Sequence, residues 1–221
     1  MCGRFTLRAR PADLVEVFEL LREPELTPRF NIAPTQPVAI VRQVDKHREI
    51  SMVRWGLIPF WAEDPKVGYS TINARAETVA KKPTFRQSFA KRRCLIPADG
   101  FYEWQRMDGR KQPFFIHMKD DRPFAFAGLW DRWKRGDQAI ESCSIIVSNA
   151  NELVEPIHDR MPVILDQEDY ARWLDPKNQD TAALQGLLRP YPAEGMTAFP
   201  ISTLVNSPRN DQPECIERLS A

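Results

Sequence analysis

The chain has 221 residues, of which 43% are hydrophobic and 28% are charged, and its formal net charge is +1. This composition is that of an ordinary globular protein that can bury a core, and it excludes a low-complexity chain. A net charge so close to zero neither favours nor excludes nucleic acid as a partner. No run approaches the roughly 18 apolar residues of a membrane span, and no apolar stretch follows the first arginines. We therefore expect a cytosolic protein with neither a membrane span nor a secretory signal.

Hydrophobic spacing and turn residues predict many short elements. In chain order these are a helix behind Pro11 with Leu14, Val17, Phe18 and Leu21 on one face, a hairpin at 38–44 and 50–57, a helix at 84–90, a strand at 93–98, a hairpin at 101–106 and 112–118, strands at 123–130 and 142–148, a helix at 151–155, a strand at 161–165, helices after Asp166 and at 181–188, and a strand at 197–203. Strands outnumber helices without regular alternation. We therefore expect a single α+β domain over residues 1–221, with a curved, mainly antiparallel, barrel-like sheet and peripheral helices.

Cysteine and histidine usage bears on metal and disulfide chemistry. The four cysteines (Cys2, Cys94, Cys143 and Cys215) are far apart without a CxxC pair, and there are only three histidines. A zinc site or a disulfide framework needs closer or more numerous ligands. We expect reduced thiols and no metal.

Basic residues are concentrated in two stretches. Residues 1–10 hold three arginines and no acid, and residues 70–93 hold seven basic residues against one glutamate. Such stretches are more often solvated faces than binding sites, and they gain meaning only beside a site with its own chemistry.

Four reactive or polar residues stand out from the pattern of a plain core. Asn73 lies in STINARAET, Glu103 in ADGFYEW, and His158 in PIHDRMP, while Cys2 directly follows Met1. Each taken alone has a structural explanation: a glutamate that faces water, a satisfied histidine, an asparagine in a turn and a small apolar residue. Taken singly, none of them identifies a function.

Nine motifs, in order, resemble those of the SOS response-associated peptidase (SRAP) family, the abasic-site-processing proteins. They run from Met1 to about Glu217: MCGRF, FNIAPTQ, RWGLIPFWA, INARAET, RRCLIPADGFYEW, KQPFFI, AGLW, IHDRMPVIL and VNSPRNDQPECIE. The resemblance implies the SRAP fold and a covalent sensor of abasic sites in single-stranded DNA. It also implies a monomer that uses no metal or organic cofactor.

The chemistry of Cys2 agrees with what the resemblance implies. An abasic deoxyribose opens to an aldehyde at C1′, and a free α-amine condenses with an aldehyde to form an imine. The Cys2 thiol, with an ordinary pKa of about 8.5, then adds to the imine carbon and closes a five-membered thiazolidine. Only a 1,2-aminothiol can close this ring, so Met1 must be removed, and the resemblance implies that the protein removes it.

The resemblance also assigns roles to other residues. Glu103 would act as general acid and base, His158 would stabilise the sugar or phosphate and assist proton transfer, and Asn73 would orient the adduct. Four residues are expected to clamp flanking phosphates: Arg4, Asn31, Arg75 and Arg160. Trp61 and Pro34 are expected to stack against or wedge apart neighbouring bases, whereas Trp55 and Trp104 are expected in the core.

Three other functions compete with this interpretation. Glutamine amidotransferases also begin Met-Cys-Gly, and their thiol attacks a carboxamide, but here Arg4 and Phe5 follow. A cysteine peptidase built from Cys2, His158 and Glu103 is the second alternative. A single-strand binding module without catalysis is the third, and it would be indifferent to the loss of the Cys2 thiol.

Overall fold

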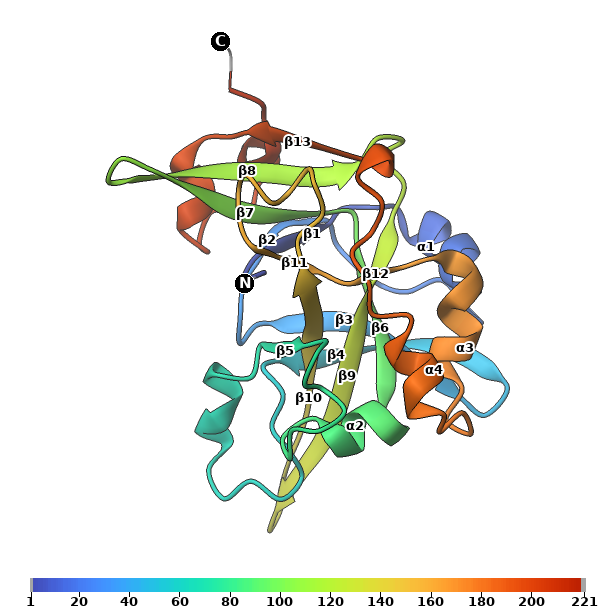
Figure 1. The fold of residues 1–221 in the computed structure, drawn as a ribbon. Coiled ribbons are helices and arrows are strands. Elements are labelled where there is room, and N and C mark those ends of the chain that lie inside the picture. The colour runs from blue at the N-terminus through green and yellow to red at the C-terminus, as the bar shows by residue number, and fades with distance from the viewer. Residues whose placement is uncertain (1, 220–221) are drawn as a thin grey trace.

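The computed structural model describes residues 2–219, and strands dominate it (Figure 1). The strands are β1 (Phe5–Leu7), β2 (Arg29–Ile32), β3 (Pro37–Val44), β4 (His47–Trp55), β5 (Asn73–Arg75), β6 (Arg93–Ala98), β7 (Gly100–Met107), β8 (Arg110–Met118), β9 (Phe124–Arg135), β10 (Gln138–Asn149), β11 (Arg160–Pro162), β12 (Ile164–Leu165) and β13 (Met196–Pro200). The α-helices are α1 (Pro11–Phe18), α2 (Arg86–Lys91), α3 (Tyr170–Leu174) and α4 (Thr181–Gln185). Short 3-10 helices are η1 (Pro65–Tyr69), η2 (Gln167–Asp169), η3 (Ala193–Gly195), η4 (Thr203–Asn206) and η5 (Pro213–Ile216).

Part of the larger sheet closes into a barrel. Strand β3 pairs with β4, β4 with β10, β10 with β9, β9 with β6, and β6 again with β3. Only the β4–β10 contact in this ring is parallel. The α-helices lie at the outside of the molecule (Figure 1). These observations confirm the expected α+β fold with a curved, mainly antiparallel, barrel-like core.

A glycine in the barrel allows close packing of its interior. Gly128 of β9 pairs with Cys94 of β6. A Cβ at Gly128 would lie 2.8 Å from the Cys94 sulfur and from Ile96, which is closer than side chains pack. β6 and β9 can therefore pack closely here because residue 128 has no side chain.

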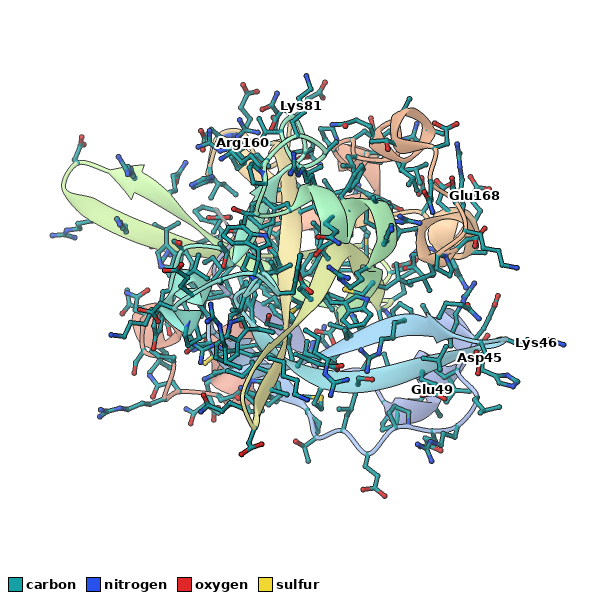
Figure 2. All side chains as sticks on the ribbon, turned by 90° about the horizontal axis from the view of Figure 1, so that it is seen from below. Asp45, Lys46, Glu49, Lys81, Arg160 and Glu168 are labelled. Carbon is teal, nitrogen blue, oxygen red and sulfur yellow. The ribbon has the colours of Figure 1, made fainter. Side chains whose placement is uncertain are left out.

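The second sheet is antiparallel and runs in the order β13-β8-β7-β1-β2. The hairpin of β7 and β8 extends from the body of the protein in both ribbon views (Figures 1 and 2). The turn of the β3–β4 hairpin, with Asp45 and Lys46, also points outward, and Glu49 lies near it on β4 (Figure 2). Of the helices in residues 2–219, none is long and apolar enough to cross a membrane.

Most predicted elements are present, and the differences have local causes. The helix behind Pro11 ends at Phe18, short of Leu21, because Glu19 takes a left-handed conformation.

The prediction of a helix at 151–155 is wrong. The Asn151 side chain accepts the Val154 N–H, and the segment forms turns.

One predicted strand is divided. The strand expected at 161–165 is two strands, because β11 pairs with β10 whereas β12 pairs with β9. Val163 lies between them and donates its N–H to Ile146 of β10 while it accepts from Ala127 of β9. The short strands β1, β2 and β5 were not predicted.

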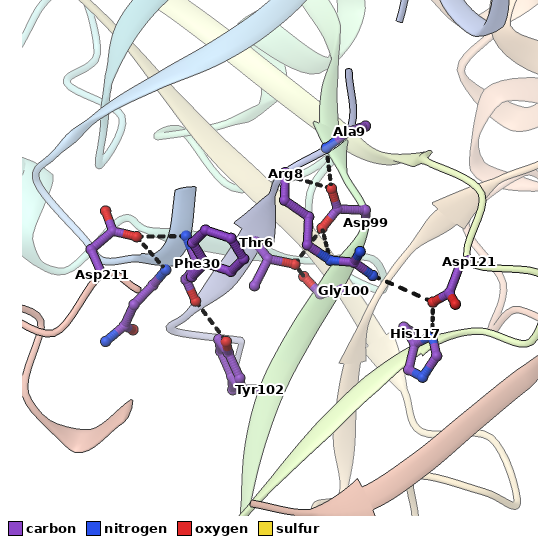
Figure 3. Close-up of polar contacts among 11 residues, drawn as sticks. Thr6, Arg8, Ala9, Phe30, Asp99, Gly100, Tyr102, His117, Asp121 and Asp211 are labelled. Atoms are coloured by element: carbon purple, nitrogen blue, oxygen red, sulfur yellow. Dashed lines mark hydrogen bonds and ion pairs between the residues drawn. The ribbon is translucent and has the colours of Figure 1, made fainter. Parts of the chain in front are cut away.

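A buried carboxylate fixes β1 in the second sheet (Figure 3). Asp99 accepts hydrogen bonds from the Thr6 hydroxyl and from the backbone N–H groups of Arg8 and Ala9, the last at 2.8 Å. Tyr102 of β7 donates its hydroxyl to the Phe30 carbonyl of β2 at 2.6 Å. These side chains hold the N-terminal strand between its two neighbours.

We predict that Asp99→Ala lowers the free energy of unfolding by about 3 kcal/mol, because it leaves several donors at a buried site without their acceptor. Urea unfolding measures this loss. The control is Asp120→Ala, since the side chain of Asp120 is 61% exposed and its removal is expected to cost less than about 0.5 kcal/mol. Equal stabilities for the two variants would contradict the role of Asp99.

Candidate active site

The pairing of β1 with β7 carries the N-terminal residues to Glu103. Phe5 pairs with Phe101 in antiparallel register, and the Tyr102 N–H donates to the Arg4 carbonyl at 3.0 Å. Continued by two residues toward the start of the chain, this register sets Gly3 and Cys2 beside the second half of β7. The N-terminal residues therefore reach Glu103 through backbone pairing.

Cys2 is fully buried, and its thiol lies 3.8 Å from the Arg4 carbonyl. Burial raises the pKa of the Cys2 thiol well above its ordinary value, and the charge of Glu103 raises it further. The expectation of a thiol with an ordinary pKa was therefore wrong, because the sequence does not reveal this burial. Met1 lies outside the described residues.

Glu103 is a carboxyl group in a largely apolar setting. It is only 2% exposed, it lies between Tyr102 and Trp104 on β7, and it pairs with Phe114 of β8. Burial raises the pKa of Glu103 to about 7. At neutral pH this group is therefore present in both protonation states, which suits a residue that both donates and accepts protons.

His158 is supplied by the loop between β10 and β11. The loop is closed at its base by the Ala150 N–H, which donates to the Asp159 carbonyl at 3.1 Å. The Gln105 side chain of β7 donates to the Pro156 carbonyl at 3.0 Å, so the loop is tied to the strand that carries Glu103. The barrel and the second sheet thus meet at this loop.

Burial favours the neutral form of His158. Its Nδ1 lies 3.0 Å from the Arg160 backbone nitrogen and 3.3 Å from the Arg160 carbonyl oxygen, so Nδ1 has a partner in either tautomer of the ring. Asp159 lies 3.1 Å from Nδ1, but its side chain is 84% exposed, so water screens its charge. Burial lowers the pKa of His158, and the charge of Arg106 acts in the same direction. The neutral imidazole has one nitrogen that donates and one that accepts, so it can take part in proton transfer.

A groove opens beside these residues. One hollow of about 380 Å³ is lined by Glu103, Trp104, Arg106, Lys111, His158 and Asn206. A second, of about 450 Å³, adjoins it and shares Trp104, Arg106 and His158. The side chains that line the first hollow combine a carboxyl, an imidazole and two cations, which suits an anionic ligand with a reactive centre.

Asn73 belongs to β5, which pairs in parallel with β10 at Ile145. Its side-chain oxygen and nitrogen are both buried, and within residues 2–219 neither has a hydrogen-bond partner. Native proteins seldom leave buried amide groups unsatisfied unless a ligand or water occupies the position. Asn73 and the loop of His158 are both anchored on the C-terminal half of β10.

Arg75 and Arg160 lie on the two strands that flank β10. Arg75 pairs with Val147, and Arg160 pairs with Asn149. Arg160 donates to the Glu77 carboxylate. Burial alone would raise the pKa of Glu77, but Arg160, with a smaller contribution from Arg75, outweighs it and lowers that pKa. Two cations and one acid therefore form a charged cluster beside β10.

Arg4 and Asn31 are held by the chain itself. Asn31 is fully buried, and its amide donates to carbonyls of the C-terminal segment, including Ser207 at 3.0 Å. Arg4 donates to the Asn31 side chain at 3.0 Å and to the Asn206 carbonyl at 3.2 Å. These contacts make Asn31 a support for Arg4 and for the segment that contributes Asn206 to the groove.

The three tryptophans and Pro34 differ in how deeply they are buried. Trp55 is fully buried, as expected, and donates to the Ile72 carbonyl. Trp104 is half-buried and packs against a small apolar cluster, as expected of a core residue, but it also lines the groove and donates to Asn206 at 2.7 Å. Trp61 is 51% exposed. Pro34 is half-buried next to β2 and lines neither of the two hollows.

Sequence reasoning missed Arg106, Lys111 and Asn206 as groove residues. The predicted hairpin at 101–106 and 112–118 holds the signal for the first two. Extending the hairpin toward its turn sets Arg106 opposite Lys111, on the strand that carries Glu103. Asn206 comes from η4, and no local pattern in the sequence indicates its position.

The model of the family described as SOS response associated peptidase (SRAP) matches residues 1–208. The chain belongs to this family. It is 48% identical to the abasic site processing protein YoqW of Bacillus subtilis (strain 168), over 98% of this chain and 99% of that protein. It is 36% identical to the abasic site processing protein HMCES of Gallus gallus, over 90% of this chain and 68% of that protein.

A solved structure shares the fold. The crystal structure of a protein from Bacteroides thetaiotaomicron superposes with a TM-score of 0.89 at 30% identity, and the match covers 99% of this chain and all of that one. A protein from Bordetella bronchiseptica superposes with a TM-score of 0.78 at 29% identity. The match covers 91% of this chain and all of that protein.

The raised pKa of Glu103 predicts a pH-dependent stability. The carboxyl group keeps its proton up to a pH of about 7 in the folded protein, against 4.5 for its ordinary value. The folded state therefore binds more protons in this range, and the free energy of unfolding falls as the pH rises. Glu103→Gln removes the titration, so its stability relative to the wild type should rise by about 2 kcal/mol between pH 5 and pH 8.

Urea unfolding at both pH values measures this difference. The exposed loop residue Glu155 provides the matched control, since Glu155→Gln makes the same chemical change at a solvated position. A difference between Glu103→Gln and the wild type that does not vary with pH would contradict the burial of an ionisable Glu103.

Proposed function

We propose that this protein senses abasic sites in single-stranded DNA and joins itself to them through Cys2. The observation that carries the proposal is the position of Cys2, the second residue of the chain, near a buried carboxyl group of raised pKa. The relatives are named abasic site processing proteins, and these names support an abasic site as the substrate. Membership of the SRAP family supports a DNA-processing role.

The first step requires a free amine on Cys2, and Met1 must therefore be removed. We propose that the protein removes Met1 itself. The Cys2 nitrogen attacks C1′ of the ring-opened sugar, and loss of one water gives an imine. Glu103, present in both protonation states near neutral pH, opens the sugar by proton transfer and protonates the departing hydroxyl. His158, which lines the groove, hydrogen-bonds to the sugar or phosphate oxygens there.

The second step closes the ring. The Cys2 sulfur bonds to C1′, the C=N double bond becomes single, and the thiol proton passes to the nitrogen. Because burial keeps this thiol protonated in the free protein, a base must take that proton, and the Glu103 carboxylate is the nearby group that can do so. Asn73 fits an orienting role, since its buried amide offers both a donor and an acceptor to the adduct.

Binding of the DNA strand involves groups around this centre. We assign Arg75, Arg160 and Arg4 to flanking phosphates: the first two lie on strands beside β10, and Arg4 lies near Asn206 of the groove. Asn31 contributes by holding Arg4. The exposed Trp61 offers an apolar face on which a base can stack. We propose Pro34 as a second apolar contact for the bases of the strand. Recognition through backbone and aldehyde needs no base at the reacting nucleotide.

The burial of the Cys2 thiol supports this function over its main rivals. A cysteine peptidase or amidohydrolase attacks through a thiolate, and such enzymes lower the pKa of their cysteine. Here burial and the Glu103 charge both act against the thiolate. Attack by the amine first, followed by addition of the thiol, avoids this obstacle.

We predict that Cys2→Ala and Cys2→Ser abolish the stable adduct, because neither can form a thiazolidine. The protein is incubated with a single-stranded oligonucleotide that holds one abasic site, and intact mass is measured after denaturation. The wild-type adduct should weigh the sum of the oligonucleotide and the protein without Met1, less one water. A stable adduct of equal yield with Cys2→Ala, or an adduct that retains Met1, would contradict the mechanism.

A control variant tests the thiol of another cysteine. Cys215 is free, and its Sγ donates to the Asn210 carbonyl away from Glu103. Cys215→Ala should leave the yield of adduct unchanged. A glutaminase assay and a peptidase assay on the same wild-type preparation test the two hydrolytic alternatives.

We also predict that Glu103→Gln slows formation of the adduct by at least about 100-fold while it leaves binding within about threefold, because general acid–base catalysis typically contributes about 10²–10⁴. Stopped time courses give the rate. Fluorescence anisotropy with an oligonucleotide that carries a tetrahydrofuran analogue, which lacks the aldehyde, gives the affinity. Equal losses in rate and affinity would reduce Glu103 to a binding residue.

A further inference from the structure

The β7–β8 hairpin places two cations in the groove that no role described above employs. Arg106 and Lys111 are paired in register across the hairpin. Both line the hollow that also contains Glu103 and His158, and Arg106 lines the adjoining hollow as well. The charge of Arg106 reaches His158, since it contributes to lowering the pKa of that imidazole.

This pair is unfavourable for the free protein. Like charges directly opposite each other on an antiparallel pair repel. Among the ion pairs between residues 2–219, neither Arg106 nor Lys111 takes part. An anion placed between the two side chains would relieve the repulsion, and phosphate suits this position because a guanidinium and an ammonium both bind it.

We propose that Arg106 and Lys111 form a phosphate-binding site for the DNA strand, on a different sheet from Arg75 and Arg160. The barrel, through β5 and β11, and the second sheet, through β7 and β8, then hold the strand from two elements, with the reacting sugar at Glu103 and His158. The proposal rests on the proposed function, because it assigns the strand's phosphate backbone as the occupant of this groove.

The hairpin provides its own matched control. Side chains alternate between the faces of a strand, so the neighbouring pair of Met107 and Arg110 faces away from Arg106 and Lys111. Arg110 is exposed and lines neither hollow of the groove. Arg110→Gln removes one positive charge from the same hairpin but not from the groove.

The first test uses an oligonucleotide with the tetrahydrofuran analogue, so that covalent chemistry plays no part. Its affinity is measured by fluorescence anisotropy over a range of salt concentrations for the wild type, Arg106→Gln, Lys111→Gln, their combination and Arg110→Gln. One lost phosphate contact on a single strand reduces the slope of log K against log salt by about 0.7. The combined variant should lose at least about 0.7, and Arg110→Gln should lose none.

The second test locates the phosphate. Two shortened oligonucleotides end at the analogue, one without the 5′ flank and its phosphate and the other without the 3′ flank and its phosphate. The combined variant should bind one of the two as well as the wild type does, because that oligonucleotide lacks the phosphate in question. It should remain weaker than the wild type toward the other.

Several results would overturn the proposal. These are an unchanged salt slope in the combined variant, an equal loss with Arg110→Gln, a deficit that persists with both shortened oligonucleotides, or a wild type that does not bind the analogue. Thermal unfolding checks that the variants remain folded. Failure of the covalent mechanism gives a different result from failure of the phosphate site. In that case the wild type binds the analogue but forms no adduct with a true abasic site.

Discussion

The antiparallel pairing of β1 with β7 is the constraint on which the site depends. It brings the first residues of the chain to a strand whose own side chains supply Glu103, Trp104 and Arg106. Asp99 holds the far end of β1 by accepting backbone N–H groups, and Tyr102 ties β7 to β2. Because backbone hydrogen bonds fix the register, the position of Cys2 relative to Glu103 is set by the sheet itself.

The barrel supplies the other half of the site through β10. This strand carries β5, with Asn73 and Arg75, and it leads into the loop that contains His158. The Gln105 contact with Pro156 joins that loop to β7. A closed barrel gives these attachments a rigid support.

Burial determines the chemistry of the two central groups. The same apolar surroundings raise the pKa of the Glu103 carboxyl to about 7 and keep the Cys2 thiol protonated. The site therefore provides a proton donor and acceptor near neutral pH but no ready thiolate. The mechanism that we propose, in which the amine reacts first and the thiol adds after the imine forms, is compatible with this arrangement.

Sequence patterns predicted the fold class and both long hairpins, because alternating apolar residues and turn residues are local signals. They missed β1 and β5, since three-residue strands carry too little periodicity. Motif resemblance indicated Cys2, Asn73, Glu103 and His158. The burial of Cys2, the support of Arg4 by Asn31 and the position of Asn206 depend on contacts between distant segments, which local patterns do not encode.

The central claim is that C1′ of the abasic sugar becomes bonded to both the nitrogen and the sulfur of Cys2. The most direct measurement is the ¹³C NMR spectrum of the adduct formed with an oligonucleotide labelled at C1′ of its abasic site. The account predicts a saturated carbon that correlates with the Cys2 nitrogen in ¹⁵N-labelled protein and has the shift of an N,S-acetal. An unsaturated imine carbon in the final adduct, or a labelled carbon bonded to any other residue, would contradict it.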